Sequence, residues 1–305
     1  MKYILKTKDL HKAYGKQQVL KGLNMKVPEG SIYGFVGQNG AGKTTLIRLV
    51  CGLQYPDSGD IEICGCKNKS DARKKMGAIV ETPALHLNMT ARENLIIQFD
   101  TLGIKDYSSI DSLLEFVGLA DTGKKVAKNF SLGMRQRLAI AIAMCNNPEF
   151  LVLDEPINGL DPQGIIDVRE LLIRINLEKS ITILISSHIL DELAKVATHY
   201  GFIANGKIVS EMSAEELEAT GKRKTVLHLK NADEIHKAMS RFDNAYEFID
   251  DNTIGVYGDI VVTELVLELH KHGIVVNRLI ESDESLEEHF FELLGGAKNA
   301  SFAKG

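Results

Sequence analysis

The spacing of apolar and polar residues predicts alternating strands and helices along most of the chain. Apolar and polar side chains alternate over residues 3–15 and 17–27, as in two paired strands, and Pro28–Gly30 has the composition of a turn. The apolar run at residues 31–37 ends at a glycine and leads into a helical pattern at residues 44–53. The N-terminal part therefore predicts a strand, a glycine-rich loop and a helix in succession.

The middle of the chain is predicted to be a helical insertion between strands. Helical spacing extends from about residue 88 to residue 146, and Thr90 and Glu93 form a capping-box sequence at the start of one helix. Apolar runs return at residues 150–156 and 181–188, separated by another helical pattern. Continuous apolar runs favour strands of a parallel sheet that is covered on both faces.

The C-terminal part predicts a second, smaller unit. One further short strand at residues 201–212 is expected to close the large domain. Between residues 225 and 280 the patterns follow the order βαββαβ, compatible with a small ferredoxin-like α+β domain. The predicted organisation is an α/β domain at residues 1–220, an α+β domain at 221–295 that ends in a helix, and a disordered tail at 296–305.

Composition and charge exclude several classes of protein. The chain is 44% hydrophobic and 25% charged, as in ordinary globular proteins, and no run approaches the ~20 apolar residues of a membrane span. The N-terminus lacks the pattern of a signal peptide, which predicts a cytoplasmic location. A net charge of -5 argues against binding to nucleic acid, which requires a basic surface. The four cysteines include one C-x-C pair without a second pair, which favours reduced thiols over a zinc site.

The glycine-rich loop has the pattern G-x-x-x-x-G-K-T of a phosphate-binding loop. It comprises Gly37, Gln38, Asn39, Gly40, Ala41, Gly42, Lys43 and Thr44, followed by Thr45. Glycines let backbone N–H groups close around phosphates at a helix N-terminus, lysine reaches the terminal phosphates, and the threonine hydroxyl can ligate Mg²⁺. A plain glycine turn is the alternative, but the strand and helix on either side favour phosphate binding.

Two acids and a histidine follow the later strands. Asp154 and Glu155 end a buried strand, where Asp154 can hold Mg²⁺ through water and Glu155 can polarise an attacking water. The alternative is a pair of surface acids at a strand end. His188 follows the strand at residues 181–187, at the end where ligands bind in open α/β sheets, although a lone histidine there is more often structural.

The segment 129–144, NFSLGMRQRLAIAIAM, distinguishes this chain from other phosphate-loop proteins. Ser131 can cap a helix that begins near Met134 and is apolar nearly all round, so a capped core helix is the simplest interpretation. Together with the phosphate loop and the LVLDE strand, however, the segment resembles the ATP-binding subunit of an ABC transporter. The resemblance covers residues 1 to about 217.

This resemblance implies a role for several residues. Gly37–Thr45 resemble the Walker A loop and residues 151–155 resemble Walker B, with ATP and Mg²⁺ as cofactors. FSLGM (130–134) stands at the position of the LSGGQ signature, where Ser131 and Gly133 would bind the γ-phosphate of ATP held by a second subunit. It departs from that signature at three positions, and altered contacts with the ATP are therefore expected.

The same family pattern implies three further contacts with ATP or the partner. Residues 158–161, including Asp161, resemble the D-loop at the dimer interface, and His188 resembles the switch histidine at the γ-phosphate. Tyr14 is placed like the aromatic residue that stacks on adenine; a packed strand tyrosine is the alternative.

Glu81 stands where most of the family has a glutamine that touches Mg²⁺ and water. Glutamate there, together with SLGM, resembles the exporter ATPases of bacitracin resistance and lantibiotic immunity. A carboxylate beside Mg²⁺ is a hard oxygen ligand whose repulsion from the nucleotide the metal offsets, so Glu81 is a candidate metal ligand and proton acceptor. A solvent-facing glutamate at a strand end is the alternative.

The sequence as a whole predicts an ATPase subunit of an ABC exporter of antibiotic peptides or drugs. Two copies, as a homodimer, would enclose two ATP molecules and drive separate transmembrane permease subunits, docked near residues 82–92, from the cytoplasmic face of the membrane. An ABC-class switch that hydrolyses ATP slowly without powering transport is the alternative. One motif set argues against a tandem translation factor, and the short stretch from Lys43 to Ser131 argues against an SMC-type ATPase.

Overall fold

The computed structural model describes residues 2–66, 69–220, 224–230 and 235–282. The chain forms two compact units, Met1–Ala214 and Glu215–Gly305. The division falls at the start of helix α8 (Ala214–Thr220), just before the predicted domain boundary at residue 220.

An antiparallel sheet forms one side of the first unit. It has the order β2-β1-β4, built from β1 (Tyr3–Tyr14), β2 (Gln17–Pro28) and β4 (Ser58–Ile63). The predicted pairing of the first two strands is confirmed, and β4, which the sequence patterns did not predict, pairs with the other edge of β1. Leu5 and Leu10 of β1 are both fully buried although they are five residues apart, because the register of β1 shifts between Thr7 and Leu10.

A six-stranded sheet forms the centre of the unit. Its order is β5 (Met76–Ile79), β6 (Phe150–Asp154), β7 (Thr182–Ser187), β3 (Ile32–Val36), β8 (His199–Ala204) and β9 (Lys207–Ser213). All neighbours are parallel except β8 and β9. Every residue of β3, β6 and β7 is buried, which accounts for their continuous apolar sequences.

The single strand predicted at residues 201–212 is a hairpin instead. Strands β8 and β9 are joined at Asn205 and Gly206, whose φ angles are 50° and 79°. Positive φ at two successive residues is the geometry of a tight hairpin turn, and Asn-Gly is the sequence that favours it most. The prediction of one strand did not take this local signal into account.

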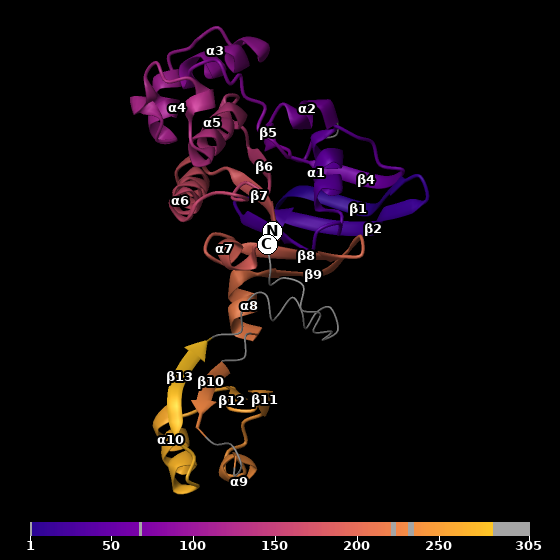
Figure 1. Cartoon of the computed structure of the whole chain (residues 1–305). Helices are drawn as coiled ribbons and strands as arrows, with labels where there is room; N and C mark the ends of the chain where they lie inside the picture. The colour runs from indigo at the N-terminus through magenta and orange to yellow at the C-terminus, as the bar shows by residue number, and fades with distance from the viewer. Residues whose placement is uncertain (1, 67–68, 221–223, 231–234, 283–305) are drawn as a thin grey trace. The chain divides into compact units, whose positions relative to one another are not determined.

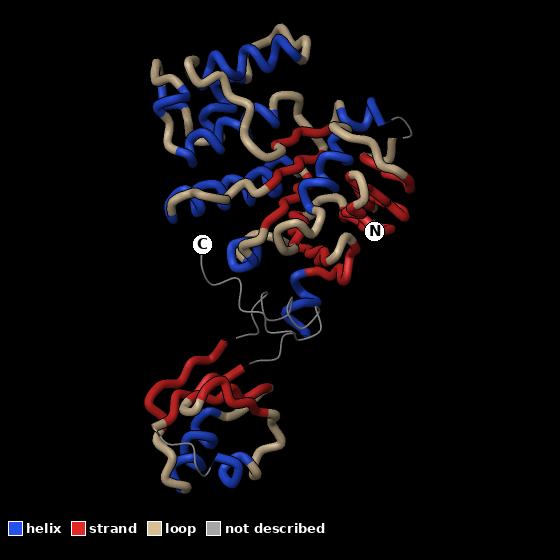
Figure 2. The backbone as a smooth tube through the Cα atoms, turned by 45° about the vertical axis from the view of Figure 1, so that its right-hand side comes forward, coloured by secondary structure: helices blue, strands red, loops and turns tan. Residues whose placement is uncertain are grey.

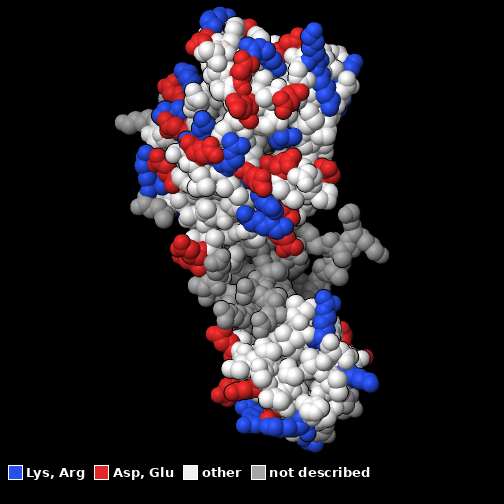
Figure 3. Space-filling model, turned by 90° about the vertical axis from the view of Figure 1, so that its left-hand side faces the viewer, with Lys and Arg blue, Asp and Glu red and all other residues white. Residues whose placement is uncertain are grey.

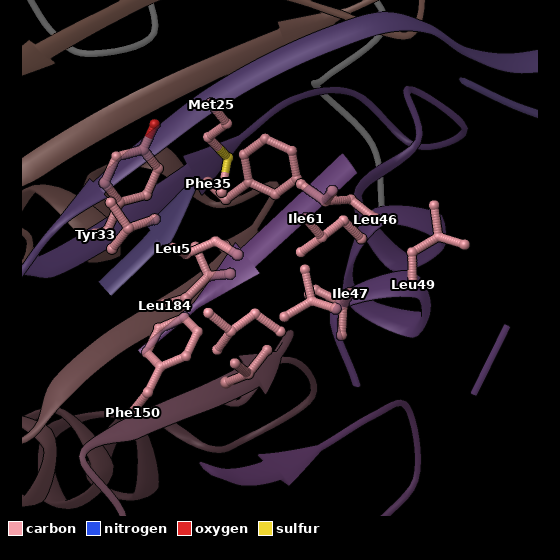
Figure 4. Packing of buried hydrophobic residues seen from close by; sticks show 14 of the residues in the cluster. Leu5, Met25, Tyr33, Phe35, Leu46, Ile47, Leu49, Ile61, Phe150 and Leu184 are labelled. Carbon is pink, nitrogen blue, oxygen red and sulfur yellow. The ribbon is translucent and has the colours of Figure 1, made fainter. Parts of the chain in front are cut away.

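Helix α1 (Lys43–Cys51) lies between the two sheets (Figure 1). Figure 4 shows its side chains packing against both sheets: Leu46 and Ile47 lie among Phe35 of β3, Leu184 of β7 and Ile61 of β4. These five side chains are at most 4% exposed. The helix that begins in the phosphate loop is therefore the centre of the main hydrophobic core.

The predicted helical insertion is present and gathers at one end of the first unit (Figure 2). It contains α3 (Ala91–Thr101), α4 (Ile110–Phe116) and α5 (Leu132–Met144). The predicted capping box is confirmed: Thr90 N–H donates to Glu93 Oε2 at 2.7 Å, and Glu93 N–H donates to Thr90 Oγ1 at 3.2 Å. The other helices of this unit are α2 (Lys69–Arg73), α6 (Pro162–Lys179) and α7 (Leu190–Ala194).

The second unit has the predicted βαββαβ order. It consists of β10 (Lys224–Leu229), α9 (Ile235–Met239), β11 (Tyr246–Asp250), β12 (Thr253–Tyr257), α10 (Val262–Lys271) and β13 (Val276–Ser282). The antiparallel sheet order β11-β12-β10-β13 confirms a ferredoxin-like arrangement, with both helices on one face (Figure 2). The helix expected at residues 285–295 and the tail at 296–305 lie outside the described residues.

Basic and acidic side chains are interspersed over the face drawn in Figure 3. Among the described residues, no helix is long and apolar enough to cross a membrane. Burial raises the pKa of the Cys51 and Cys145 thiols to about 12 and that of Cys64 to about 11. These cysteines are therefore protonated at neutral pH and inert as nucleophiles.

Gly77→Ala is expected to destabilise the first unit. A Cβ at Gly77 in β5 would lie 2.0 Å from the carbonyl oxygen of Ala143 in α5, so strand and helix must separate. Overpacking of this kind lowers the free energy of unfolding by about 1–3 kcal/mol. The measurement is urea unfolding, with Ala78→Ser at the exposed neighbouring position as a control expected to stay within about 0.5 kcal/mol. Equal midpoints for both variants would contradict this packing.

Candidate nucleotide-binding site

The phosphate loop opens onto a cavity of about 450 Å³ at the carboxyl ends of the parallel strands. Residues of the loop, of the β6 and β7 ends and of β2 line it: Gln17, Val19, Gln38, Asn39, Gly40, Gly42, Lys43, Thr44, Thr45, Glu155, Asn158 and His188. Gly40 and Gly42 have φ angles of 80° and 114°, which only glycine adopts readily. Gly42 precedes α1 and has no side chain that could cap it. The first N–H groups of the helix are therefore available to an anion.

Lys43 presents a largely buried cation to this cavity. Its side chain is 6% exposed, and its ammonium donates to the carbonyl oxygen of Gly37 at 2.6 Å and lies 3.6 Å from Glu155 Oε1. Burial lowers the pKa of Lys43, while the Glu155 carboxylate acts in the opposite direction. The ammonium is therefore poised for an anionic ligand that supplies further negative charge.

Ser186 of β7 orients both acids at the end of β6. The side chain of Asp154, which is 3% exposed, accepts a hydrogen bond from Ser186 Oγ at 2.5 Å. The same hydroxyl accepts from the backbone N–H of Glu155 at 3.0 Å. Sequence reasoning missed Ser186, although two serines at the carboxyl end of a strand with an apolar centre were a visible signal. Its hydroxyl fixes one acid at the side chain and the other at the backbone.

Glu155 and His188 contact each other across the cavity. His188 Nδ1 lies 2.8 Å from Glu155 Oε2, and both side chains are about one quarter exposed, at 27% and 21%. Glu155 has a φ of 50°, an uncommon conformation for a non-glycine residue and one that recurs at functional sites. Three predicted residues, Lys43, Glu155 and His188, are thus brought together in one chain of contacts.

Ser131, Gly133 and Asp161 are not among the residues that line this cavity. Ser131 caps α5 as predicted, because its Oγ accepts from Met134 N–H at 3.2 Å. Asp161 caps α6 in the same way, accepting from Gly164 N–H at 3.2 Å. A Cβ at Gly133 would be 3.4 Å from the Cα of Gly164, so the starts of the two helices pack closely through glycine. Ser131 and Asp161 are exposed, and within one chain they stay outside the site.

Tyr14 lies beside the cavity on an exposed part of β1. It is 42% exposed and faces Gln17, a lining residue, across the β1–β2 ladder. Its hydroxyl donates to the side-chain oxygen of Gln54, and the Lys12 ammonium lies 5.8 Å from its ring centroid. The ring is therefore exposed, and its hydroxyl is held in place.

Glu81 and Ala41 also lie outside the set of lining residues, as do Asp154 and Gly37. Glu81 follows β5, and its carboxylate forms an ion pair with the guanidinium of Arg48 on α1. Its φ is 60° and its side chain is 56% exposed. The predicted contact between Glu81 and a metal would therefore require the carboxylate to leave Arg48.

Comparison with known proteins identifies the class. The family model described as ABC transporter matches residues 20–158. The bacitracin transport ATP-binding protein BcrA of Bacillus licheniformis is 43% identical over 302 residues, which cover 97% of this chain and 99% of that protein. The lantibiotic transport ATP-binding protein SrtF of Streptococcus pyogenes is 44% identical over 208 residues, which cover 68% of this chain and 90% of that protein.

Solved structures agree with the sequence comparison. CbiO1 of Clostridium perfringens, part of the ABC transporter complex cbiONQ, has a TM-score of 0.65 and 26% identity over 79% of this chain and 96% of its own. An ATP-binding subunit of an ABC transporter has a TM-score of 0.62 and 30% identity over 71% of this chain and 92% of its own. The chain therefore belongs to the ABC transporter ATP-binding proteins. It is an ATPase subunit of that family, as its sequence motifs predicted.

Ser186→Ala is expected to impair ATP hydrolysis beyond its effect on stability. Loss of the hydroxyl removes the donor to the buried Asp154 carboxylate, whereas the Glu155 N–H keeps its bond to the Ser186 carbonyl oxygen at 3.2 Å. An unsatisfied buried group of this kind lowers the free energy of unfolding by about 1–3 kcal/mol. Misplacement of both acids should also reduce kcat about tenfold or more.

Thr182→Val is the matched control for this variant. Thr182 lies at the opposite end of β7, is 1% exposed and accepts from Gly30 N–H at 2.9 Å through its hydroxyl. This variant should lose similar stability and retain its kcat. An unchanged kcat in Ser186→Ala would show that Ser186 has only a structural role.

Proposed function

We propose that this chain powers the export of antibiotic peptides by binding and hydrolysing ATP on the cytoplasmic side of a membrane transporter. The main support is that Lys43, Glu155 and His188 meet in one cavity. Glu155 Oε1 lies 3.6 Å from Lys43 Nζ, and Glu155 Oε2 lies 2.8 Å from His188 Nδ1. The lysine binds the phosphates, the carboxylate orients and polarises the attacking water, and the histidine contacts both the carboxylate and the γ-phosphate.

Mg²⁺ fits the oxygen donors that this site provides. The Thr44 hydroxyl lines the cavity, and the Asp154 carboxylate is buried and already held in place by Ser186. Hard oxygen donors of this kind suit Mg²⁺, which keeps several waters. When bound, the ion would neutralise charge on the phosphates. We propose Thr44 and Asp154 as its ligands, the second through water, and Glu81 as a ligand only after it leaves Arg48.

We further propose that two copies of the chain enclose two ATP molecules. Each site would combine the Walker residues of one copy with Ser131 and Gly133 of the other, where the start of α5 offers its N–H groups to the γ-phosphate. The exposure of Ser131 and Asp161, outside their own cavity, supports this arrangement because both remain available to a facing copy. Tyr14 would stack on the adenine.

The proposed cargo is an antibiotic peptide of the bacitracin type. BcrA aligns over 302 residues, so the similarity includes the second unit, whereas SrtF aligns over 208. We propose that separate membrane subunits select the peptide and contact the loop near residues 82–92.

Co-expression with the membrane subunits that co-purify with the chain should raise resistance to bacitracin more than to a lantibiotic. Equal sensitivity with an active and an inactive ATPase would contradict export and favour a slow regulatory switch.

Glu155→Gln is expected to trap an ATP-bound dimer. The amide cannot accept a proton from water, so ATP remains bound and holds the two copies together. Light scattering after gel filtration should show a dimer in saturating ATP and a monomer in ADP. A monomer in saturating ATP would contradict the composite site.

Two changes at Ser131 test whether it faces the partner's phosphate. Asp and Asn both cap helices as well as Ser, so either substitution preserves α5. In the Glu155→Gln background, Ser131→Asp should abolish the dimer because it places a negative charge against phosphate. Ser131→Asn should retain the dimer. Equal dimer content in both variants would remove Ser131 from the interface.

A further inference from the structure

The loop after β5 is anchored at two points by side chains from different parts of the first unit. At its start, Glu81 forms the ion pair with Arg48 of α1. Farther along, His86 N–H donates to Asn94 Oδ1 at 2.8 Å, and the Asn94 amide donates back to the His86 carbonyl at 3.1 Å. Asn94 is a buried residue of α3. Residues 82–85 therefore connect the nucleotide-binding core to the helical insertion.

The first anchor holds Glu81 in a conformation that a side chain disfavours. A φ of 60° places the residue in the left-handed region, where Cβ crowds the backbone. The chain turns there directly after β5 ends at Ile79. The Arg48 guanidinium donates to the charged Glu81 carboxylate. A glutamine at this position would offer only a neutral amide oxygen, which is a weaker acceptor.

Arg48 also belongs to the helix that binds phosphate. Lys43 and Arg48 lie on α1, and a rise of 1.5 Å per residue places them about 7.5 Å apart along its axis. Because α1 is packed between two sheets, a shift at its phosphate end moves Arg48 with it. The ion pair then passes that shift to the start of the loop.

We propose that Arg48 is a positioning residue that holds Glu81, and through it residues 82–85, against the nucleotide-binding core. This inference rests on the proposed function, because it gives the loop that meets the membrane subunits a direct link to the phosphate helix. Loss of either partner releases the same anchor. The effects of changing Arg48 and Glu81 therefore should not add.

Amide hydrogen exchange on the full chain without nucleotide tests the link directly. Arg48→Met, which keeps the aliphatic stem, should speed exchange of the His86 amide, which is protected by its hydrogen bond to Asn94, by about two- to fivefold, the range for a partly exposed pair. Glu81→Gln should have a similar effect, and the double variant should exchange no faster than either. An unchanged rate in Arg48→Met, or a double effect equal to the product of the single effects, would overturn the proposal.

Two further variants control for charge and for general loosening. Arg48→Lys keeps a cation at the position and should retain most of the protection. Lys75→Gln removes a comparable ion pair at the opposite end of β5, where Lys75 and Glu149 are 2.8 Å apart and 43% and 53% exposed. It should leave exchange of the His86 amide unchanged. Faster exchange in this control would show that the loop responds to the loss of any surface charge and would overturn the proposal.

Steady-state kinetics separates positioning from direct contact with ATP. Arg48→Met should lower kcat about two- to fivefold with KM for ATP within about twofold of wild type, and Arg48→Lys should restore kcat. A raised KM with unchanged kcat would place Arg48 at the nucleotide and overturn the proposal. Exchange is measured without ATP, so its result is independent of dimer trapping by Glu155→Gln, which tests the proposed function alone.

Discussion

The burial of α1 between two sheets is the constraint on which the nucleotide site depends. Leu46 and Ile47 are fully buried, and each such side chain contributes about 1.5–3 kcal/mol. The ion pair between Lys43 and Glu155 has a largely buried cation, so the cost of desolvation offsets much of its attraction. Packing rather than charge therefore sets the separation of the two groups, and the site is formed before any ligand arrives.

Features with a local sequence signal were predicted well. The phosphate loop, the capping box at Thr90 and the capping of α5 by Ser131 each depend on residues within a few positions of one another, and the structure contains all three. The βαββαβ order of the second unit followed from periodicity alone. The hairpin at Asn205 was missed although its signal, the Asn-Gly pair, was local, because residues 201–212 were interpreted as one strand.

Contacts between distant segments could not be predicted from the sequence. Ser186 meets Asp154 across 32 residues and Arg48 meets Glu81 across 33 residues, and both contacts depend on the order of strands in the sheet. The sequence does not show that order, because parallel neighbours need not be consecutive in the chain. The predicted roles of the acids thus came without the residue that orients them.

The starts of α5 and α6 form one unit because two glycines allow the helices to approach. Gly133 and Gly164 leave room for close backbone packing, and each lies within the first turn after its cap. A shift of Ser131 therefore moves Asp161 with it. The variant signature FSLGM retains Ser131 and Gly133, the capping side chain and the packing glycine, and varies at positions that this packing does not require.

The charge of Glu81 is compatible with a neighbouring polyanion because it has a cationic partner within the chain. At 32% and 56% exposure, the pair with Arg48 is worth about 0.2–1 kcal/mol. A contact this weak can be exchanged for another cation at little cost, whereas a buried pair could not. Glutamate at this position therefore differs from glutamine in its negative charge, which strengthens the contact with the guanidinium on α1, whereas the amide oxygen of glutamine is a neutral acceptor.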